Sequence, residues 1–151
     1  MHIHLCVTMG APVERVWQTV ERIDTHTDWM TDAESITFRT DQRAGVGTEF
    51  DCLTRVGPFS TVDTMRVTEW EPNAVMGIHH CGLVTGTGRF TLRAVGAGVT
   101  EFCWDEDLIF PARMGAAIGA RVSRPILMRI WRANLAQLRT LAEANPEDRA
   151  G

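Results

Sequence analysis

The spacing of apolar residues changes along the chain, and each change predicts a different element. Residues 2–8 ("HIHLCVT") alternate between apolar and polar positions, which is typical of a half-buried strand. Within residues 13–23 the apolar side chains recur every three or four positions, as in an amphipathic helix, and Pro12 suits the first turn of that helix. Residues 25–30 ("THTDWM") can form one more short helical turn, capped by one of its threonines. The chain therefore begins with a strand followed by two short helices.

From residue 35 to residue 110 the pattern predicts six consecutive strands. They are "SITFRT", "TEFDCLTRV", "STVDTMRVTEWE", "AVMGIHHC", "TGTGRFTLRA" and "TEFCWDEDLIF". Glycine, proline and asparagine punctuate the short connections between them, as expected for tight turns. Such short connections indicate an antiparallel meander.

The last predicted element is a long helix. After the Gly/Ala-rich run "ARMGAAIGA", Ser123 and Pro125 mark the start of a helix of about 20 residues, and residues 144–151 form a frayed tail. The order of elements predicts one α+β domain over residues 1–151, in which a curved antiparallel sheet of six to seven strands wraps around the C-terminal helix. The space left between sheet and helix is a natural ligand cavity.

The turn at residues 96–98 sets the register of the last hairpin. Pairing Leu92 with Phe102 and Phe90 with Trp104 keeps the aromatic residues on one face. The opposite face then sets Arg93 against Glu101, Arg89 against Asp105 and Thr87 against Asp107. Facing opposite charges contribute up to about 1 kcal/mol each, so this register predicts two ion pairs on the solvent face.

Glu106 is the exception in this strand, because it shares the inner face with aromatic residues. It lies opposite Gly88, and across the next hairpin Gly86 or Gly88 lies near His80. Two groups separated by one strand start roughly 10 Å apart, so both could touch one small ligand. The alternative places Glu106 in water at the mouth of the cavity and makes His80 a hydrogen-bonded packing residue.

The candidate ligand-binding residues lie on the predicted inner faces. They are Trp29, Phe50, Cys52, Met65, Val67, Met76, Ile78, Phe90, Leu92, Trp104, Leu108, Met114, Ile130, Trp131, Asn134 and Leu138. Trp29, Met30 and residues 112–120 are expected at the entrance. Asn134 falls on the apolar stripe of the last helix and needs hydrogen-bond partners, which could be a ligand, Glu106 or backbone near the first helix.

The composition of the chain limits which partners and cofactors we expect. A net charge of −4 and a pI near 5.7 give no basic footprint for nucleic acid, and no run of apolar residues reaches the length of a membrane span. The N-terminal sequence lacks the features of a signal peptide, so we expect a cytoplasmic protein, either a monomer or a homodimer. The chain has no lysine and no tyrosine, and it carries no phosphate or dinucleotide fingerprint. We expect no cofactor.

The four cysteines, Cys6, Cys52, Cys81 and Cys103, lie far apart and each falls inside a predicted strand. This distribution favours reduced packing residues over disulfides or a metal site. His2 and His4 share one strand face, as metal ligands can, but no third ligand is evident, so no metal is expected.

Several stretches in order resemble the START/polyketide cyclase superfamily (SRPBCC), whose members share the helix-grip fold of the major birch pollen allergen. They are "APVERVWQTVERIDTHTDWM", "GVGTEF", "VTEWEP", "GTGRFTL" and "WRANLAQLRTLAE", and the resemblance runs from His4 to Glu143. It implies an apolar cavity that binds lipids, polyketides or other hydrophobic molecules, sometimes with ring closure or dehydration.

Three functions follow as hypotheses. The first is a binding protein for a small hydrophobic molecule, oriented by Glu106, His80 and Asn134. The second is a cofactor-independent cyclase or dehydratase in which Glu106 and His80 act as acid and base. The third is an adaptor in a larger assembly, which an exposed apolar patch would favour.

Overall fold

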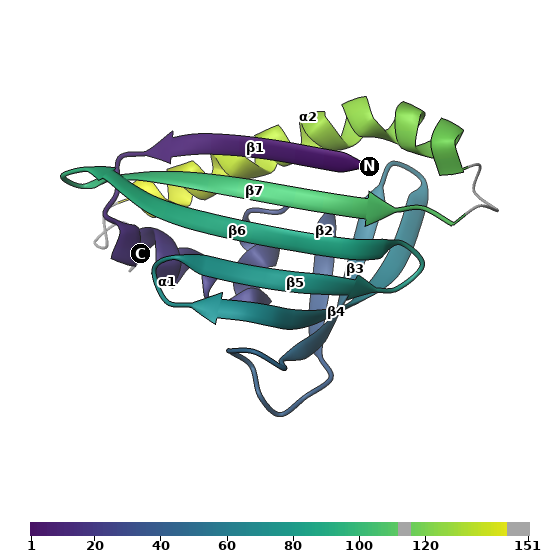
Figure 1. The fold of residues 1–151 in the computed structure, drawn as a ribbon, viewed down its shortest axis with the longest axis horizontal. Helices are drawn as coiled ribbons and strands as arrows, with labels where there is room; N and C mark the ends of the chain where they lie inside the picture. The colour runs from purple at the N-terminus through teal and green to yellow at the C-terminus, as the bar shows by residue number, and fades with distance from the viewer. Residues whose placement is uncertain (112–115, 145–151) are drawn as a thin grey trace.

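The computed structural model describes residues 1–111 and 116–144, the second range with side chains from residue 123 onward (Figure 1). The elements follow in the order β1 (His2–Met9), α1 (Val13–Val20), the 3₁₀ helix η1 (Ile23–Asp28), β2 (Ala33–Phe38), β3 (Glu49–Val56), β4 (Phe59–Glu71), β5 (Val75–Cys81), β6 (Thr85–Gly96), β7 (Val99–Ile109) and α2 (Ala116–Glu143). In these two ranges, no helix is both long and apolar enough to cross a membrane.

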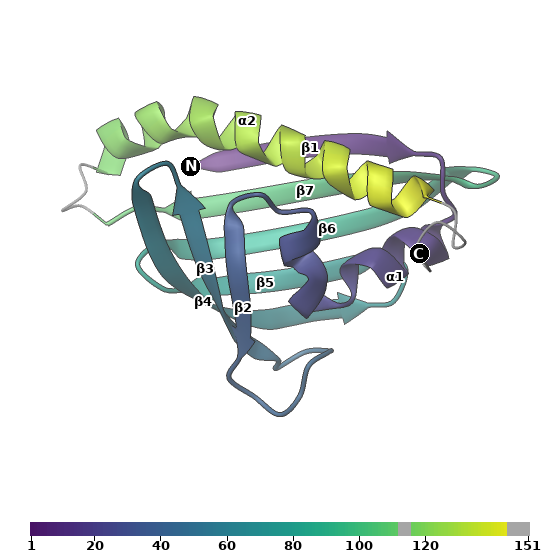
Figure 2. The same cartoon turned by 180° about the vertical axis from the view of Figure 1, so that it is seen from behind.

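All seven strands form one antiparallel sheet in the order β1-β7-β6-β5-β4-β3-β2. The first strand therefore pairs with the last one, and β2 lies at the far edge. The sheet bends so strongly that β2 and β3 run across the direction of β5 to β7, and α2 extends along the β1 side (Figure 2). This architecture confirms the predicted α+β helix-grip fold, with two short helices after the first strand.

Two predicted helix starts are wrong. Helix α2 begins at Ala116 and contains 28 residues, so Pro125 lies inside it rather than in its first turn. The sequence predicts that the helix starts after the Gly/Ala-rich run, but residues 116–120 of that run are already helical, because alanine is the strongest helix former. The helix continues through Pro125, which lies on its exposed face. The 3₁₀ helix begins at Ile23 after Arg22, so its threonines lie within it and do not cap it.

The closed core lies at the α1 end of the molecule. There Val16 and Val20 of α1 and Leu138 of α2 are all fully buried. Trp17 packs edge-to-face on Trp70 with ring centroids 5.2 Å apart. Each large apolar side chain buried in this way contributes about 1.5–3 kcal/mol, so this end anchors α2 while the other end of the sheet remains available for a cavity.

The β6–β7 register is the predicted one, including Phe90 opposite Trp104 and Gly88 opposite Glu106. Arg93 and Glu101 form the predicted ion pair at 2.7 Å. The second predicted pair is absent, because Arg89 binds Glu69 at 3.2 Å instead of Asp105. Gly77 lies between Arg89 and Glu69 in the sheet and has no side chain, so the guanidinium can reach across β5.

The expectation of reduced packing residues is wrong for two cysteines. Cys6 and Cys103 face each other across β1 and β7, with their Cα atoms 4.1 Å apart, and form a disulfide. They are separated by 97 residues, and only the pairing of the first strand with the last one brings them together. Of the free cysteines, Cys52 is buried as expected, whereas Cys81 is exposed.

Candidate functional site

A cavity of about 280 Å³ lies between the inner face of the sheet, the segment from η1 to β2, and helix α2. His80 and Glu106 both contribute to its wall. Nine of the predicted ligand-binding residues also line it, namely Phe50, Cys52, Met65, Met76, Ile78, Phe90, Trp104, Leu108 and Trp131. The inner-face pattern of the strands therefore identified much of the wall.

Other predicted ligand-binding residues lie elsewhere. Trp29, Val67, Leu92, Asn134 and Leu138 are buried in the core and do not line the cavity, and Ile130 is half-buried outside it. Met114 lies outside the described residues. These positions were inferred from helical or strand faces alone, and a face that points inward can meet the solid core as well as the cavity.

The cavity opens at two hairpins that the sequence reasoning did not consider. Phe59 and Val62 beside the β3–β4 turn are 75% and 56% exposed, and Leu83 in the β5–β6 turn is 38% exposed, yet all three line the cavity. Trp29 is only 1% exposed, so its predicted place at the entrance is wrong, while Met30 lines the wall. Apolar residues beside or within the turns, as in "GPFSTV" and "GLV", were the available signal.

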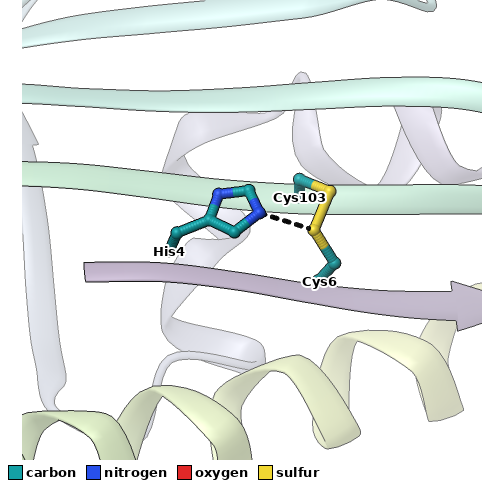
Figure 3. A group of neighbouring side chains, drawn as sticks. All are labelled: His4, Cys6 and Cys103. Atoms are coloured by element: carbon teal, nitrogen blue, oxygen red, sulfur yellow. Dashed lines mark hydrogen bonds between the residues drawn. A yellow bond between two sulfur atoms is a disulfide. The ribbon is translucent and has the colours of Figure 1, made fainter.

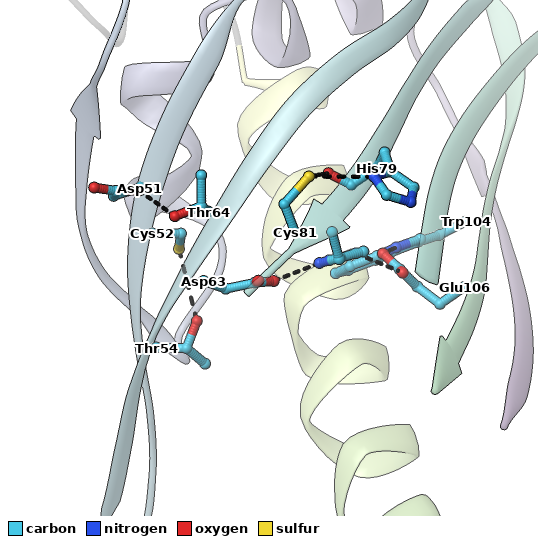
Figure 4. Close-up of polar contacts among 10 residues, drawn as sticks. Asp51, Cys52, Thr54, Asp63, Thr64, His79, Cys81, Trp104 and Glu106 are labelled. Carbon is cyan, nitrogen blue, oxygen red and sulfur yellow. Dashed lines mark hydrogen bonds and ion pairs between the residues drawn. The ribbon is translucent and has the colours of Figure 1, made fainter. Parts of the chain in front are cut away.

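A chain of polar side chains crosses the cavity wall from β4 to β7 (Figure 4). The imidazole of His80 contacts Asp63 through Nδ1 and lies 3.0 Å from Glu106 Oε2 through Nε2. The indole Nε1 of Trp104 donates to Glu106 Oε1 at 2.8 Å. The sequence did not indicate Asp63 as a member of this chain. Asp63 lies on β4, and two strands, β5 and β6, separate it from Glu106 on β7.

Gly88 makes this chain possible. A Cβ atom at Gly88 would lie 2.5 Å from Glu106 Oε1, which is closer than Cβ atoms approach other atoms in proteins, and 3.0 Å from Oε2. The carboxylate of Glu106 therefore occupies the space above β6 that a side chain would fill, and from there it reaches His80 on β5.

The protonation of His80 follows from its two partners. Burial by itself lowers the pKa of this imidazole, but hydrogen bonds to Asp63 and Glu106 and the charges of both carboxylates outweigh burial and raise the pKa to about 10. His80 is consequently an imidazolium at neutral pH, flanked by two carboxylates in a largely apolar wall.

A second histidine of the cavity wall, His26, has a lowered pKa instead of a raised one. Burial lowers the pKa of His26 to about 4, although its hydrogen bond to Val20 opposes the change. Its Nε2 donates to the Val20 carbonyl over 2.6 Å, so the ring is neutral and held in place. His26 is a packing residue rather than a proton carrier.

The side chain of Asn134 forms hydrogen bonds to protein groups and does not line the cavity. Its Oδ1 accepts hydrogen bonds of 2.9 Å from both the amide and the hydroxyl of Thr31, and its Nδ2 donates to Asp32 at 2.7 Å. Of the open alternatives, the bond to backbone near the first helices is the one observed. Asn134 ties α2 to the segment that forms one wall of the cavity.

Flat aromatic surfaces complete the wall. Trp104 and Trp131 stack with centroids 4.9 Å apart and an interplanar angle of 21°, and Phe90 meets Trp104 edge-on at 5.3 Å. A planar apolar molecule would find matching surfaces here, beside the carboxylate of Glu106.

Known proteins match this chain at the level of family and fold. The sequence profile of the family described as "Polyketide cyclase / dehydrase and lipid transport" matches residues 2–143. A search of curated protein sequences returned no significant match.

Solved structures with the same fold share little sequence with this chain. The Zhui aromatase/cyclase from Streptomyces sp. R1128 superposes with a TM-score of 0.80 at 17% identity, covering 95% of this chain and 93% of that one. A START superfamily protein from Mycobacterium smegmatis gives a TM-score of 0.74 at 14% identity, covering 93% and 98%. The di-domain ARO/CYC BexL from the BE-7585A biosynthetic pathway gives 0.74 at 17% identity, with 97% of this chain covering 51% of that chain.

Proposed function

The chain belongs to the polyketide cyclase/dehydrase and lipid transport family, and on that premise we propose that it binds a small, largely apolar, ring-containing molecule with a hydrogen-bond donor. The observation that carries this proposal is the carboxylate of Glu106, which is 4% exposed within an apolar and aromatic cavity. A buried charge in such a wall is costly unless it is paired, and His80 provides that pairing. An ion pair with a purely structural role would not need to border a cavity, so the position of Glu106 points to a ligand.

The size of the cavity supports a compact ligand. Ligand pockets commonly measure about 300–1,000 Å³, and the value of about 280 Å³ lies at the lower limit. The flat surfaces of Trp104, Trp131 and Phe90 favour fused rings over a flexible chain. A molecule of two or three rings fits these walls better than a long-chain lipid.

The polar chain favours a donor on that molecule. Both ring nitrogens of His80 are already bonded, so the hydrogen-bonding capacity left to a ligand is the acceptor capacity of the two carboxylates. Asp63 Oδ1 is buried and has no hydrogen-bond partner among the described residues. Two carboxyl groups beside the protonated His80 favour a ligand with a hydroxyl or amine donor and disfavour a ligand that carries a carboxylate.

A titration series tests this proposal. Trp104 and Trp131 lie in the wall, so their fluorescence should report binding of 2-naphthol, 2-methoxynaphthalene and 2-naphthoate. We expect 2-naphthol to bind about tenfold more tightly than the methyl ether, the equivalent of one charge-assisted hydrogen bond of about 1.5 kcal/mol, and the anion to bind most weakly. Glu106→Gln should reduce the preference for the hydroxyl, while equal affinities for all three probes would contradict the proposal.

Native mass spectrometry of the purified protein identifies the natural ligand class. A bound species released on denaturation, with fused rings and a hydroxyl or amine, is the expected result. A bound fatty acid would contradict the donor preference.

A second candidate function is cofactor-independent dehydration or ring closure, and the contact between Glu106 and a protonated His80 favours it. Glu106 would accept the proton on a carbon beside a carbonyl group, the carbon–hydroxyl bond would break, and the same proton would leave with the hydroxyl as water. His80 would hold the carboxylate in place and balance its charge during transfer.

Turnover separates the two candidates. Aromatic and polyketide-like β-hydroxy ketones would be incubated with wild type and with Glu106→Gln, and the loss of water would be followed by mass spectrometry. Dehydration by wild type that collapses in Glu106→Gln would support the enzyme. Binding without dehydration would support the carrier.

A further inference from the structure

The outer face of the β1–β7 pair carries a ladder of metal-ligating groups on the side of the sheet away from the cavity. His2 faces Asp107, His4 faces Asp105, and Cys6 faces Cys103 in one continuous register. None of these residues lines the cavity, so the proposed ligand site makes no use of them.

Figure 3 shows how His4 is oriented toward the two cysteines. Its Nδ1 lies 2.6 Å from Asp105 Oδ1, and its Nε2 lies 3.2 Å from Cys6 Sγ. When Nδ1–H donates to the carboxylate, the lone pair of the ring is on Nε2 and faces the sulfur atoms. A histidine held by a carboxylate in this way has the orientation of a metal ligand.

The three potential ligand atoms are close enough to share one ion. His4 Nε2, Cys6 Sγ and Cys103 Sγ all lie within 4.8 Å of one another. In a tetrahedral zinc centre, bonds of about 2.0–2.3 Å place neighbouring ligand atoms roughly 3.5 Å apart. Small side-chain movements on the exposed face of the sheet would complete that geometry once the sulfur atoms are free to separate.

We propose that the reduced form of the Cys6–Cys103 pair binds Zn²⁺ through both thiolates and His4 Nε2, and that disulfide formation releases the ion. Reduction by an external dithiol transfers two electrons to the disulfide and yields two thiols and the oxidised reductant. Zinc then replaces the two thiol protons, and water takes the fourth position. A low-molecular-weight disulfide accepts the two electrons in the reverse direction, and Zn²⁺ leaves.

Oxidation and metal binding exclude each other at this site. A sulfur atom in the disulfide is no longer a thiolate ligand, so zinc stabilises the dithiol and slows its oxidation. Cys6 is exposed and accessible to small thiols and disulfides. The face therefore acts as a redox-controlled metal site that is independent of the cavity.

The chain contains a matched comparison on β5. His79 and Cys81 have the same spacing as His4 and Cys6, and His79 Nδ1 lies 3.2 Å from Cys81 Sγ. Both residues are exposed, but Cys81 is not paired with a second cysteine. If one histidine and one cysteine were sufficient to bind the metal ion, replacing Cys81 would weaken metal binding as much as replacing Cys6.

Cobalt binding to the 151-residue chain tests the proposal. The protein is reduced, freed of reductant without oxygen, and titrated with Co²⁺ as a spectroscopic probe and Zn²⁺ as a competitor. We expect one Co²⁺ per chain with a thiolate-to-cobalt absorption band, which one equivalent of Zn²⁺ abolishes and which the oxidised protein lacks. Cys6→Ser and Cys103→Ser should each lose the band, and Cys81→Ser should retain it.

Two positioning variants refine the test. Asp105→Asn should weaken zinc binding about 10- to 100-fold, because Asp105 orients the histidine ligand, and His4→Gln should weaken it at least as much. Circular dichroism of each variant verifies that it is folded. A reduced wild type without the band, a band that disappears equally in Cys81→Ser, or unchanged zinc affinity in His4→Gln would overturn the proposal.

Discussion

The raised pKa of His80 predicts how the stability of this protein depends on pH. In the unfolded chain the imidazole titrates near 6.5, whereas in the folded protein the two carboxylates beside it keep the proton bound up to a pH of about 10. Between these values the folded state binds one more proton than the unfolded state. The stabilisation from His80 is therefore fully present below pH 6.5 and is lost as the pH rises toward 10.

The magnitude follows from the same linkage. Each pH unit in this window changes the free energy of unfolding by up to about 1.4 kcal/mol, so raising the pH from 6.5 to 9 should cost roughly 3 kcal/mol. His80 and Glu106 are both buried, so solvent screens this interaction only weakly.

Urea unfolding at several values between pH 6.5 and pH 9 measures the effect. The matched variant is Asp63→Asn combined with Glu106→Gln, which keeps the side-chain shapes and removes both charges, so that burial alone acts on His80. We expect the stability of wild type to fall by roughly 3 kcal/mol more than that of the variant over this range. Parallel pH profiles for the two proteins would refute the assignment of an imidazolium to His80.

Further predictions concern the cavity, the hydrogen bonds of Asn134 and the disulfide. Gly88→Ala should displace the Glu106 carboxylate and weaken 2-naphthol binding about tenfold in fluorescence titrations, equivalent to about 1.4 kcal/mol, without unfolding the protein. Asn134→Ala should lower the free energy of unfolding by about 1–3 kcal/mol in urea, because Thr31 and Asp32 lose their partner. Cys6→Ser should lower the stability of the metal-free, oxidised protein by about 2–4 kcal/mol, measured in the same way, because the disulfide closes a long loop.

Local patterns predicted the elements of the fold well, because alternation and helical spacing depend on residues close in the sequence. The β6–β7 register followed from matching aromatic residues on one face, and it placed Glu106 inward, opposite Gly88. The predicted start of α2 at Ser123 and Pro125 is wrong, because a long helix can tolerate one exposed proline in its interior.

Contacts between strands that are far apart in the sequence could not be predicted from local patterns. The pairing of β1 with β7 decides the Cys6–Cys103 disulfide and the partner of His4, and no local pattern encodes it. Asp63 escaped notice for a similar reason, because its contact with His80 depends on the β4–β5 register and its bulge. Trp29 was expected at the entrance but is buried, because the depth at which the segment after η1 packs is a tertiary property.

The most direct test of the proposed ligand site is a nuclear magnetic resonance titration of ¹⁵N-labelled protein with 2-naphthol. The indole signal of Trp104 and the ring nitrogen signals of His80 report on the two groups that hold Glu106. We expect both sets of signals to shift on binding in wild type, and we expect the His80 shift to be lost in Glu106→Gln. Binding that leaves the signals of Trp104 and His80 unchanged would place the ligand elsewhere and contradict the proposed site.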